Sequence, residues 1–390
     1  MSKRKYKVCF FTGTRAEYGI LKHLMQEISG SDDFIFQLIV TGSHLSERYG
    51  YTVREIIDDG FKIDSKIDIN LINDSDLSTC KSLGELISKI SDVFSEIKPD
   101  LVFLLGDRYE LIGAAISATI FRIPIAHIHG GEKTEGAFDE SIRHSITKLS
   151  HIHFVANEIY RKRVIQLGED QKYVFNVGGL GVDAIKKTKL LSKQSLEKSL
   201  GLKFMKKNLL ITFHPVTLLE KKDSENEINQ LLKSMSLLEE TLQIFTMPNA
   251  DPGNYYIFKA IETYVKNNKF AFLFSSLGQL KYYSCLKQVD ALVGNSSSGI
   301  LEAPSFNIGS INIGDRQKGR LKARSVISVE ADSELITKAI EQLYSKDFSK
   351  ILKTNINPYG NGDTSKKIIK IIKTINFQDI LKKSFHDIDF

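Results

Sequence analysis

The feature that most constrains the fold is a regular alternation of short apolar runs with longer amphipathic stretches. In the first half of the chain, the apolar runs are residues 8–12, 36–41, 101–105, 125–129, 153–156 and 174–177. The amphipathic stretches between them include residues 20–28, 83–97, 110–121 and 140–150. Continuous apolar strands separated by helices are typical of a parallel sheet that helices cover on both faces. The pattern therefore predicts an α/β fold with a doubly wound parallel sheet.

The same alternation restarts in the second half, with apolar runs at residues 209–213, 243–246, 270–274, 291–293 and 308–313. Between the halves lies a polar, Lys-rich segment. We therefore predict an N-terminal Rossmann-like domain (1–180), a linker (181–207) and a C-terminal Rossmann-like domain (208–360). A final helix and tail (361–390) follow; the helix could pack back on the first domain, and the tail is expected to be partly disordered. Two such domains form a central cleft that the carboxyl ends of the strands face, where ligands bind.

The composition limits the class of protein. Of 390 residues, 42% are hydrophobic and 26% charged, as in globular proteins. The sequence has no apolar run of the length that spans a membrane, and its three widely spaced cysteines fit neither a disulfide framework nor a zinc site. We expect a cytoplasmic protein with no membrane partner. The net charge of +6 comes without a nucleic-acid motif, so helix faces and a site for an anionic small molecule explain it better than nucleic acid does.

A serine-rich motif in the second half is a candidate anion site. Three serines, 296–298, stand where a helix should begin after the apolar run 291–293. Free backbone N–H groups and the helix dipole at such a start attract an anion, and Glu302 lies near enough to reach a sugar hydroxyl. A loop with Arg316 and two further cations comes next. The motif suits a phosphate or diphosphate, but equally a capped helix with a solvated loop; it is neither a Walker loop nor the dinucleotide fingerprint.

Polar clusters also follow three strands of the first half, namely Gly13-Thr14-Arg15-Ala16-Glu17-Tyr18-Gly19, Gly106-Asp107-Arg108-Tyr109-Glu110 and His127-Ile128-His129-Gly130-Gly131-Glu132. Asp107, at the end of a strand, suits an N-cap as well as a catalytic group. Strand alternation places His127 and His129 on one face. Asp139 and Arg143 open the next helix at a spacing of four residues.

These residue types raise the question of which chemistry is present. His127, His129, Asp139 and His144 could bind a metal, but their spacing matches no recognised ligand motif and the nearby cationic groups disfavour another cation. Covalent catalysis has no candidate, because the sequence has neither a Gly-x-Ser-x-Gly elbow nor a plausible Cys/His pair. Acid–base chemistry remains. Carboxylates and histidines, among them His214 at a strand end, would act beside arginines that can hold a departing diphosphate.

Together and in this order, the motifs resemble the hydrolysing UDP-N-acetylglucosamine 2-epimerases of sialic-acid biosynthesis. The matching pieces are residues 13–18, 106–108, 127–132, 139–148, 214–217, 294–299 with Glu302, 314–317 and 357–360. The resemblance implies a GT-B fold and a homodimer. It also implies that UDP-GlcNAc loses its C2 proton and UDP by anti elimination, and that water adds to the 2-acetamidoglucal to release N-acetylmannosamine. It implies neither a metal nor another cofactor.

The resemblance also implies roles for individual residues. The UDP would be held by Ser296, Ser297, Glu302 and Arg316, with Arg15 and Arg108 near the phosphates. The acid–base candidates are Asp107, Glu132, Asp139 and His214, with Arg143 and His144 positioning them. Many relatives carry Glu where His129 stands, so His129, Asp107 and Asp139 all remain candidates for the base that takes the C2 proton. Arginines stay charged and so suit the diphosphate, whereas a crowded acidic site raises the pKa of a base.

Two differences favour the hydrolysing branch over the non-hydrolysing epimerases. Ile20 stands where the latter carry Lys, and residues 214–217 replace their His-Arg-Arg-Glu-Asn run. Three alternatives stay open. The substrate could be UDP-N,N′-diacetylbacillosamine, with segments 44–49 and 74–82 as candidates for contacts to C4 and C6 of the sugar. The chain could also be a GT-B glycosyltransferase, or a UDP-sugar sensor without activity.

Overall fold

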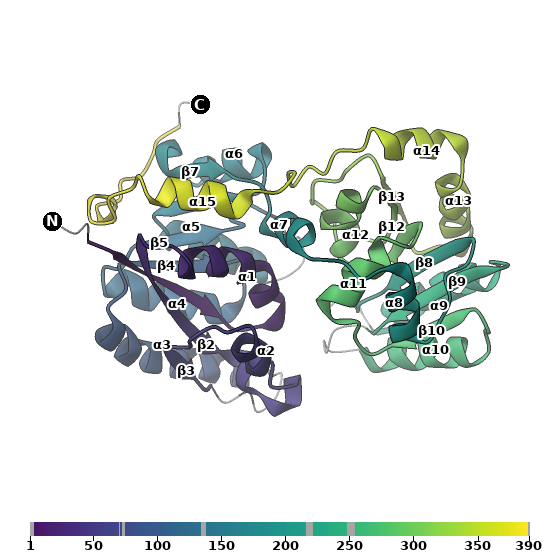
Figure 1. The fold of residues 1–390 in the computed structure, drawn as a ribbon, viewed down its shortest axis with the longest axis horizontal. Coiled ribbons are helices and arrows are strands. Elements are labelled where there is room, and N and C mark those ends of the chain that lie inside the picture. The colour runs from purple at the N-terminus through teal and green to yellow at the C-terminus, as the bar shows by residue number, and fades with distance from the viewer. Residues whose placement is uncertain are drawn as a thin grey trace. The chain divides into compact units, whose positions relative to one another are not determined.

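The computed structural model describes residues 4–69, 71, 75–133, 138–215, 221–247 and 254–388. The chain divides into two compact units. Unit 1 comprises Met1–Glu132, Phe138–Ala184 and Gly362–Phe390, and unit 2 comprises Lys133–Ala137 and Ile185–Asn361. Each unit is built on one parallel sheet with helices on both faces, which confirms the predicted pair of doubly wound α/β domains (Figure 1).

Unit 1 contains a seven-stranded sheet in the order β3-β2-β1-β4-β5-β6-β7. The strands are β1 (Tyr6–Thr12), β2 (Phe34–Thr41), β3 (Ser65–Ile67), β4 (Leu101–Leu105), β5 (Ile125–Ile128), β6 (Ile152–Val155) and β7 (Val174–Asn176). The helices are α1 (Arg15–Ser29), α2 (Val53–Asp58), α3 (Asp76–Ile97), α4 (Tyr109–Ile120), α5 (Asp139–Leu149), α6 (Glu158–Gln166), α7 (Leu180–Lys187, which continues into unit 2) and α15 (Thr364–Ile372). Short 3-10 turns are η1 (Gly42–Leu45), η2 (Glu47–Tyr49), η3 (Gln171–Tyr173) and η5 (Asp379–Leu381).

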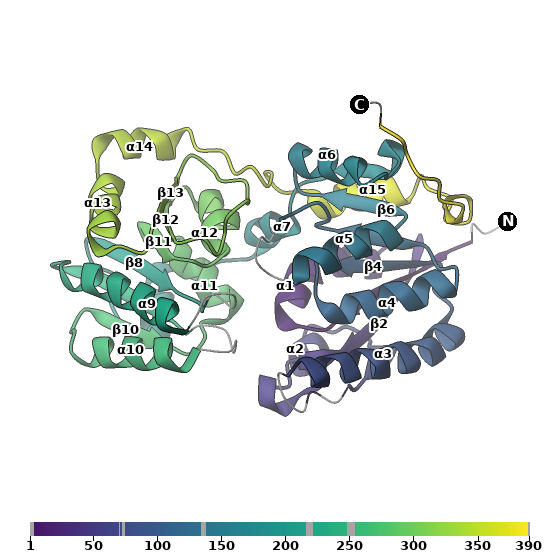
Figure 2. The ribbon, with the colours of Figure 1, turned by 180° about the vertical axis from the view of Figure 1, so that it is seen from behind.

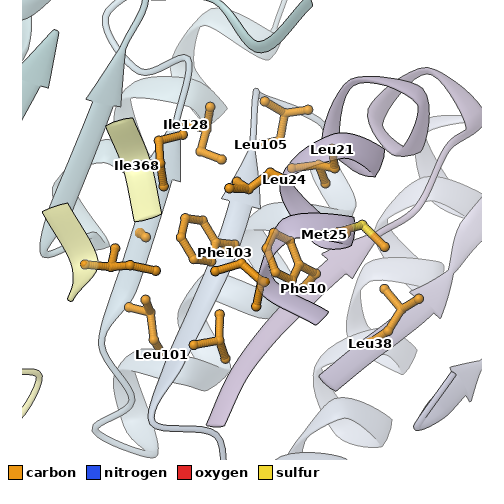
Figure 3. Close-up of a cluster of buried hydrophobic side chains, with 14 of the residues drawn as sticks. Phe10, Leu21, Leu24, Met25, Leu38, Leu101, Phe103, Leu105, Ile128 and Ile368 are labelled. Carbon is orange, nitrogen blue, oxygen red and sulfur yellow. The ribbon is translucent and has the colours of Figure 1, made fainter. Parts of the chain in front are cut away.

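The core of unit 1 lies on both faces of this sheet. On one face, α1 and α15 pack over the central strands, where Phe10 of β1 stacks on Phe103 of β4 with ring centroids 4.9 Å apart. Figure 3 shows Ile368 of α15 within this cluster of buried side chains. On the other face, α3, α4 and α5 cover the sheet (Figure 2). Burial on both faces explains why the strands read as continuous apolar runs.

The last segment of the chain belongs to unit 1. Asp183 of α7 accepts hydrogen bonds from the backbone N–H groups of Thr364 and Ser365, both at 2.7 Å, and so caps the start of α15. The tail beyond α15, which was expected to be partly disordered, contacts the unit as far as His386, whose backbone N–H donates to the carbonyl oxygen of Gly168 at 2.9 Å. The ammonium of Lys383 bonds the backbone oxygen of Ser150 at 2.7 Å and pairs with buried Glu169 at 2.6 Å. A buried carboxylate that needs cationic partners explains this docking.

Unit 2 contains a six-stranded parallel sheet in the order β10-β9-β8-β11-β12-β13. The strands are β8 (Lys207–Thr212), β9 (Thr241–Thr246), β10 (Ala271–Phe274), β11 (Ala291–Gly294), β12 (Gly309–Ile313) and β13 (Val326–Val329). The helices are α8 (Lys193–Leu200), α9 (Lys221–Ser236), α10 (Asn254–Lys266), α11 (Gly278–Leu286), α12 (Ser298–Leu301), α13 (Ser333–Leu343) and α14 (Lys346–Lys353), and η4 spans Ala303–Phe306. The segment 181–207, expected as a linker, carries α8, whose Leu196 and Leu200 are buried.

Both sheets reverse their strand order at one place. In unit 1 the reversal lies between β1 and β4, and in unit 2 between β8 and β11. Ligands of open α/β sheets bind beyond the carboxyl ends of the strands at such a point. Among the described residues, no helix is both long and apolar enough to cross a membrane.

Candidate active site

In unit 1, a charged cluster forms beside the strand-order reversal. Asp107 follows β4, and its carboxylate forms an ion pair with Arg143 of α5. The guanidinium of Arg143 is only 3% exposed and also lies 3.6 Å from Glu140, whose other oxygen is 3.1 Å from Nε2 of His144. Nδ1 of His144 is buried and has no hydrogen-bond partner among the described residues. Asp107, Arg143, Glu140 and His144 thus form one connected set, in which Arg143 joins α5 to the turn after β4.

A second pair follows β5. Nδ1 of His129 lies 3.5 Å from a carboxylate oxygen of Glu132, which is nearly buried. The strand ends at Ile128, and His129 has a φ of 66°, so strand alternation does not extend to it. The expectation that His127 and His129 share one face of a strand was therefore wrong. The left-handed conformation at His129 begins the turn that brings its ring to Glu132.

Asp139 is the first residue of α5, where an acidic side chain favours the helix dipole. It lies four residues before Arg143, whose guanidinium forms an ion pair with Asp107 on another element. Residues 134–137, which precede α5, lie outside the described residues, as do residues 216 and 217 of the His214 motif and residue 74 of the segment 74–82.

Two arginines expected near a phosphate are held by carboxylates. Arg15, at the start of α1, lies 3.0 Å from Glu55. Arg108 donates to both oxygens of Glu110, at 3.2 and 3.3 Å. Beside this pair, Glu17 accepts the backbone N–H groups of Gly13 and Thr14, forming a capping box. Both arginines therefore have a carboxylate partner, which is the partly exposed Glu55 of α2 for Arg15 and the buried Glu110 of α4 for Arg108.

Sequence reasoning did not assign a role to Glu17 or Glu110. Burial, and then the neighbouring charge of Glu110, raise the pKa of Glu17 to about 7, although Arg108 and the backbone bonds oppose the shift. A signal was present for Glu17, since Thr14 and Glu17 have the spacing of a capping box. The sequence offered none for the proximity of Glu17 to Glu110, which comes from the adjacency of β1 and β4 in the sheet.

In unit 2, one asparagine joins the two strands that flank the reversal. Oδ1 of Asn295 accepts the backbone N–H of His214 at 2.7 Å, and its Nδ2 donates to the carbonyl of His214 at 2.8 Å. The Asn295 carbonyl in turn accepts from Arg316 at 3.2 Å and from Gln317 at 3.0 Å. Burial, and then the charge of Arg316, lower the pKa of His214 to about 3, so that its imidazole is neutral. His214 and Arg316 are thus held around Asn295.

The serine-rich motif forms a shorter helix than the sequence suggested. The α-helix spans only Ser298–Leu301, because Pro304 follows at once and opens a 3-10 turn. Ser297 occupies the N-cap position without a side-chain capping bond, and Oγ of Ser296 accepts the N–H of Ser298 at 3.3 Å. The motif is therefore a compact turn of serines directly after β11.

Glu302 is held by hydroxyl groups. Oγ of Ser298 donates to one of its oxygens at 2.5 Å, and the Tyr283 hydroxyl donates to the other at 3.2 Å. The Tyr282 hydroxyl bonds Oγ of Ser298 at 2.7 Å. Burial raises the pKa of Glu302, and these bonds oppose the shift. Sequence reasoning missed both tyrosines, because nothing in the α11 segment marks them as neighbours of the serine turn.

The comparisons with known proteins give the chain a family. The family model described as UDP-N-acetylglucosamine 2-epimerase matches residues 26–373. The chain belongs to this family. It is 47% identical over 390 residues, 100% of both chains, to the "GDP/UDP-N,N′-diacetylbacillosamine 2-epimerase (hydrolyzing)" of Campylobacter jejuni. It is 38% identical over 384 residues, 98% of this chain and 97% of the relative, to the "Polysialic acid biosynthesis protein P7" of Escherichia coli.

The solved structures show that the fold is shared. A crystal structure of UDP-GlcNAc 2-epimerase from Neisseria meningitidis bound to UDP-GlcNAc matches with a TM-score of 0.81 at 20% identity, over 95% of this chain and 100% of that one. The family resemblance and the fold predicted from the sequence are thereby confirmed. This member of the epimerase family carries its charged cluster in unit 1 and its serine turn in unit 2.

Proposed function

We propose that this chain is a hydrolysing 2-epimerase that converts UDP-GlcNAc and water to N-acetylmannosamine and UDP. The observation that carries the proposal is the ion-paired set of Asp107, Arg143, Glu140 and His144 at the strand-order reversal of unit 1. Its relatives support the hydrolysing outcome, because the Campylobacter protein is named as a hydrolysing enzyme and is similar over its full length.

In this proposal, unit 2 binds most of the UDP and unit 1 supplies most of the acid–base groups. In unit 2, Ser296, Ser297 and Arg316 bind the diphosphate, and Glu302 accepts the ribose hydroxyls. Glu302 suits this role because Ser298 and Tyr283 fix both of its oxygens, while a carboxylate can accept further bonds. In unit 1, we assign Arg15 and Arg108 to contacts with the phosphates, and the remaining candidates to acid–base chemistry.

The reaction begins with the loss of UDP and of the C2 proton. As the bond from C1 to the diphosphate breaks, positive charge develops at C1 and acidifies the C2 proton, so that a carboxylate suffices as base. Asp107 is our first choice, because Arg143 fixes its carboxylate; Asp139 and His129 are the alternatives. Glu132 lies beside His129, and His214 is neutral. Glu132 and His214 can then deliver the proton and the water that add to the glucal, with His144 as a positioning group.

A second substrate is favoured by one observation. The relative that is 47% identical over the full chain carries N,N′-diacetylbacillosamine in its name, whereas the Escherichia coli relative is named for polysialic acid. UDP-N,N′-diacetylbacillosamine is therefore the second candidate. Within the segment 44–49, His44 is buried and bonds Thr12 at 3.1 Å and Thr52 at 2.8 Å. Contacts to C4 or C6 would then come from Ser46, Glu47 or Tyr49.

The deciding experiment is NMR of the purified protein in deuterated water with each UDP-sugar in a separate tube. We expect free N-acetylmannosamine with deuterium at C2, together with UDP. Turnover of the diacetylated sugar alone would replace the substrate and keep the reaction. Accumulation of UDP-N-acetylmannosamine would contradict hydrolysis. An unchanged pair of tubes would contradict the epimerase proposal, and a glycosyltransferase would become the leading reading.

We further propose that the protein is a cytoplasmic homodimer that supplies a sialic-acid or related nonulosonic-acid pathway. The name of the Escherichia coli relative supports the pathway. Light scattering coupled to size-exclusion chromatography measures the mass directly. A mass near twice 44.0 kDa is expected, and a mass near 44.0 kDa would contradict the dimer.

A further inference from the structure

His127 is a buried histidine that the proposed reaction does not use. It lies near the end of β5 and has no exposed surface. Nε2 of its ring is 2.8 Å from the carbonyl oxygen of Gly106, and Nδ1 is 3.1 Å from Oγ1 of Thr147. Both ring nitrogens are thus engaged inside the protein, and the side chain has no access to a substrate.

The two partners of His127 belong to the segments that carry the Asp107–Arg143 ion pair. Gly106 is the residue before Asp107. Thr147 lies one turn after Arg143 on α5, and its Oγ1 is also 3.0 Å from the carbonyl oxygen of Arg143. A single imidazole therefore connects the turn after β4 to α5, in parallel with the ion pair.

The bond to Gly106 fixes one hydrogen of the ring. A carbonyl oxygen can only accept, so Nε2 carries the hydrogen that is donated to Gly106. In the neutral ring Nδ1 then carries no hydrogen, and it shares the single hydroxyl hydrogen of Thr147 with the carbonyl oxygen of Arg143. Burial lowers the pKa of His127 to about 3; the bond to Gly106 opposes this shift, and the histidines at 153, 129 and 144 add to it. At neutral pH the ring is a neutral, fixed spacer.

The segment after β5 packs closely against the ring. A Cβ at Gly130 would lie 3.1 Å from both Nδ1 of His127 and Oγ1 of Thr147, so the chain after β5 closes directly over this hydrogen bond. Asp107 has 23% of its side chain exposed, and Arg143 has 3%. The exposed end of the pair faces solvent, and His127 braces the backbone behind it.

We propose that His127 is a positioning residue, which sets the place of the Asp107 carboxylate relative to Arg143 and α5. This inference rests on the proposed function, since it assigns to the ion pair a role in the elimination. Displacing a catalytic group by about 1 Å can cost a hundredfold in rate. Loss of the bond to Gly106 frees the turn that carries Asp107, whereas loss of the bond to Thr147 leaves that turn in place.

The neighbouring strand offers a matched control. His153 of β6 pairs in register with His127 and is 1% exposed. Its Nε2 bonds Glu169 at 2.9 Å, a residue of the C-terminal docking site. Replacing His153 therefore removes an equally buried imidazole from the same sheet, and its partner Glu169 reaches α5 through the ammonium of Lys148, at 2.6 Å, rather than through Arg143 or Thr147.

The experiment compares His127→Gln, His127→Asn and His153→Gln. The amide nitrogen of Gln reaches the place of ring Nε2 and can donate to Gly106, while the amide of Asn reaches only the place of Nδ1. We expect kcat of His127→Asn to fall about a hundredfold with KM and the Kd for UDP within twofold. We expect His127→Gln to keep kcat within about fivefold and His153→Gln to lower the melting temperature with kcat nearly unchanged.

Equal losses of kcat in the Gln and Asn variants, or an equal loss in His153→Gln, would overturn the proposal. So would a change carried by KM or by UDP binding. Thr147→Val, which keeps the ring and its bond to Gly106, covers the case in which His127→Asn does not fold: it should retain kcat, and a hundredfold loss would count against Gly106 as the essential contact.

A measurement without activity separates this inference from the proposed function. The ¹⁵N shifts of the His127 ring should report a neutral ring with hydrogen on Nε2 throughout pH 5 to 8. Titration within that range, or hydrogen on Nδ1, would refute the bracing geometry even in an active enzyme. Wild-type protein that turns over neither UDP-sugar while showing the expected ring would instead refute the proposed function.

Discussion

The strand-order reversals of the two units occupy equivalent places in their sheets but hold their candidate residues in different ways. In unit 1, oppositely charged side chains fix one another: Arg143 pairs with Asp107, and Arg108 pairs with Glu110. In unit 2, neutral groups do the holding, because Asn295 fixes the backbone of His214 and two hydroxyls fix Glu302. Ion pairs fix charged groups relative to one another, as proton transfer requires, whereas hydroxyls leave a carboxylate free to accept bonds from a ligand.

The largest effect on turnover is expected for Asp107→Asn. The amide keeps the shape and an oxygen acceptor for Arg143, but it cannot take a proton. We expect turnover to fall between about a thousandfold and ten-thousandfold, as for loss of a general base, with the Kd for UDP within twofold. The control is Asp347→Asn, a change on an 88% exposed side chain of α14, which should leave both turnover and the Kd for UDP unchanged. Loss of UDP binding in a folded Asp107→Asn protein would break the division between the units.

The next test asks how rigidly unit 2 presents its serine turn. Gly294 ends β11 with a φ of 135°, and a Cβ there would lie 2.0 Å from the carbonyl oxygen of Thr212 on the adjacent strand. Gly294→Ala should therefore lower the free energy of unfolding by about 4 kcal/mol in urea. The matched change is Gly181→Ala in α7, where a Cβ meets open space; it should raise that free energy by about 1 kcal/mol. If both variants changed the free energy of unfolding by the same amount, the backbone at Gly294 would have to move away from Thr212 without an energetic cost.

Most strands of the two sheets could be predicted from the sequence. The apolar run 101–105 coincides with β4, and the other ten predicted strands differ from the observed ones by one or two residues at one or both ends. The strands β3 and β13 were missed: both are edge strands, β3 has one buried residue of three, and β13 has no buried residue. Central strands are easier to recognise, because burial on both faces gives them continuous apolar runs.

The candidate site was predictable to a lesser degree. Residues next to strand ends could be listed, because parallel strands bring their carboxyl ends to one edge. Long-range partners could not: the structure pairs Arg143 with Asp107, 36 residues away, and no spacing in the sequence indicates that pair. Likewise, Tyr283 meets Glu302 only through the packing of α11 beside the serine turn. Pairings of this kind depend on which helices cover which strands, and local spacing does not encode that.

A pH experiment sharpens the electrostatic side of unit 1. Because the pKa of Glu17 is raised from its ordinary 4.5 to about 7, the folded protein keeps a proton that the unfolded chain has released. Through this group, the free energy of unfolding should fall as the pH rises from about 4.5 to 7, by up to roughly 3 kcal/mol. Glu17→Gln stays neutral and keeps an acceptor for Gly13 and Thr14. Its stability relative to wild type should therefore grow across this window and level off above it.

The control for Glu17 is Glu158→Gln on α6, whose side chain is 54% exposed. Its difference from wild type should stay flat over the same pH range in urea unfolding. A flat difference for Glu17→Gln as well would mean that Glu17 is ionised in the folded protein. In that case the backbone N–H groups of the capping box outweigh burial and Glu110.

The smallest expected effect tests the hydroxyl-held carboxylate of unit 2. Glu302→Ala should weaken UDP binding about thirtyfold, or about 2 kcal/mol, because charged hydrogen bonds to the ribose are lost. Tyr283→Phe removes one of the two hydroxyls that orient Glu302 and should cost only about threefold. Calorimetry gives both values. Since Asp107 and Arg143 lie in the other unit, kcat at saturating substrate should change less than twofold in either variant. A fall in kcat without weaker UDP binding would instead place Glu302 among the groups that act on the reacting bond. In that case the ion pairs of unit 1 would not alone mark the residues of the chemical step, and the hydroxyl-held carboxylate of unit 2 would not mark a purely binding residue.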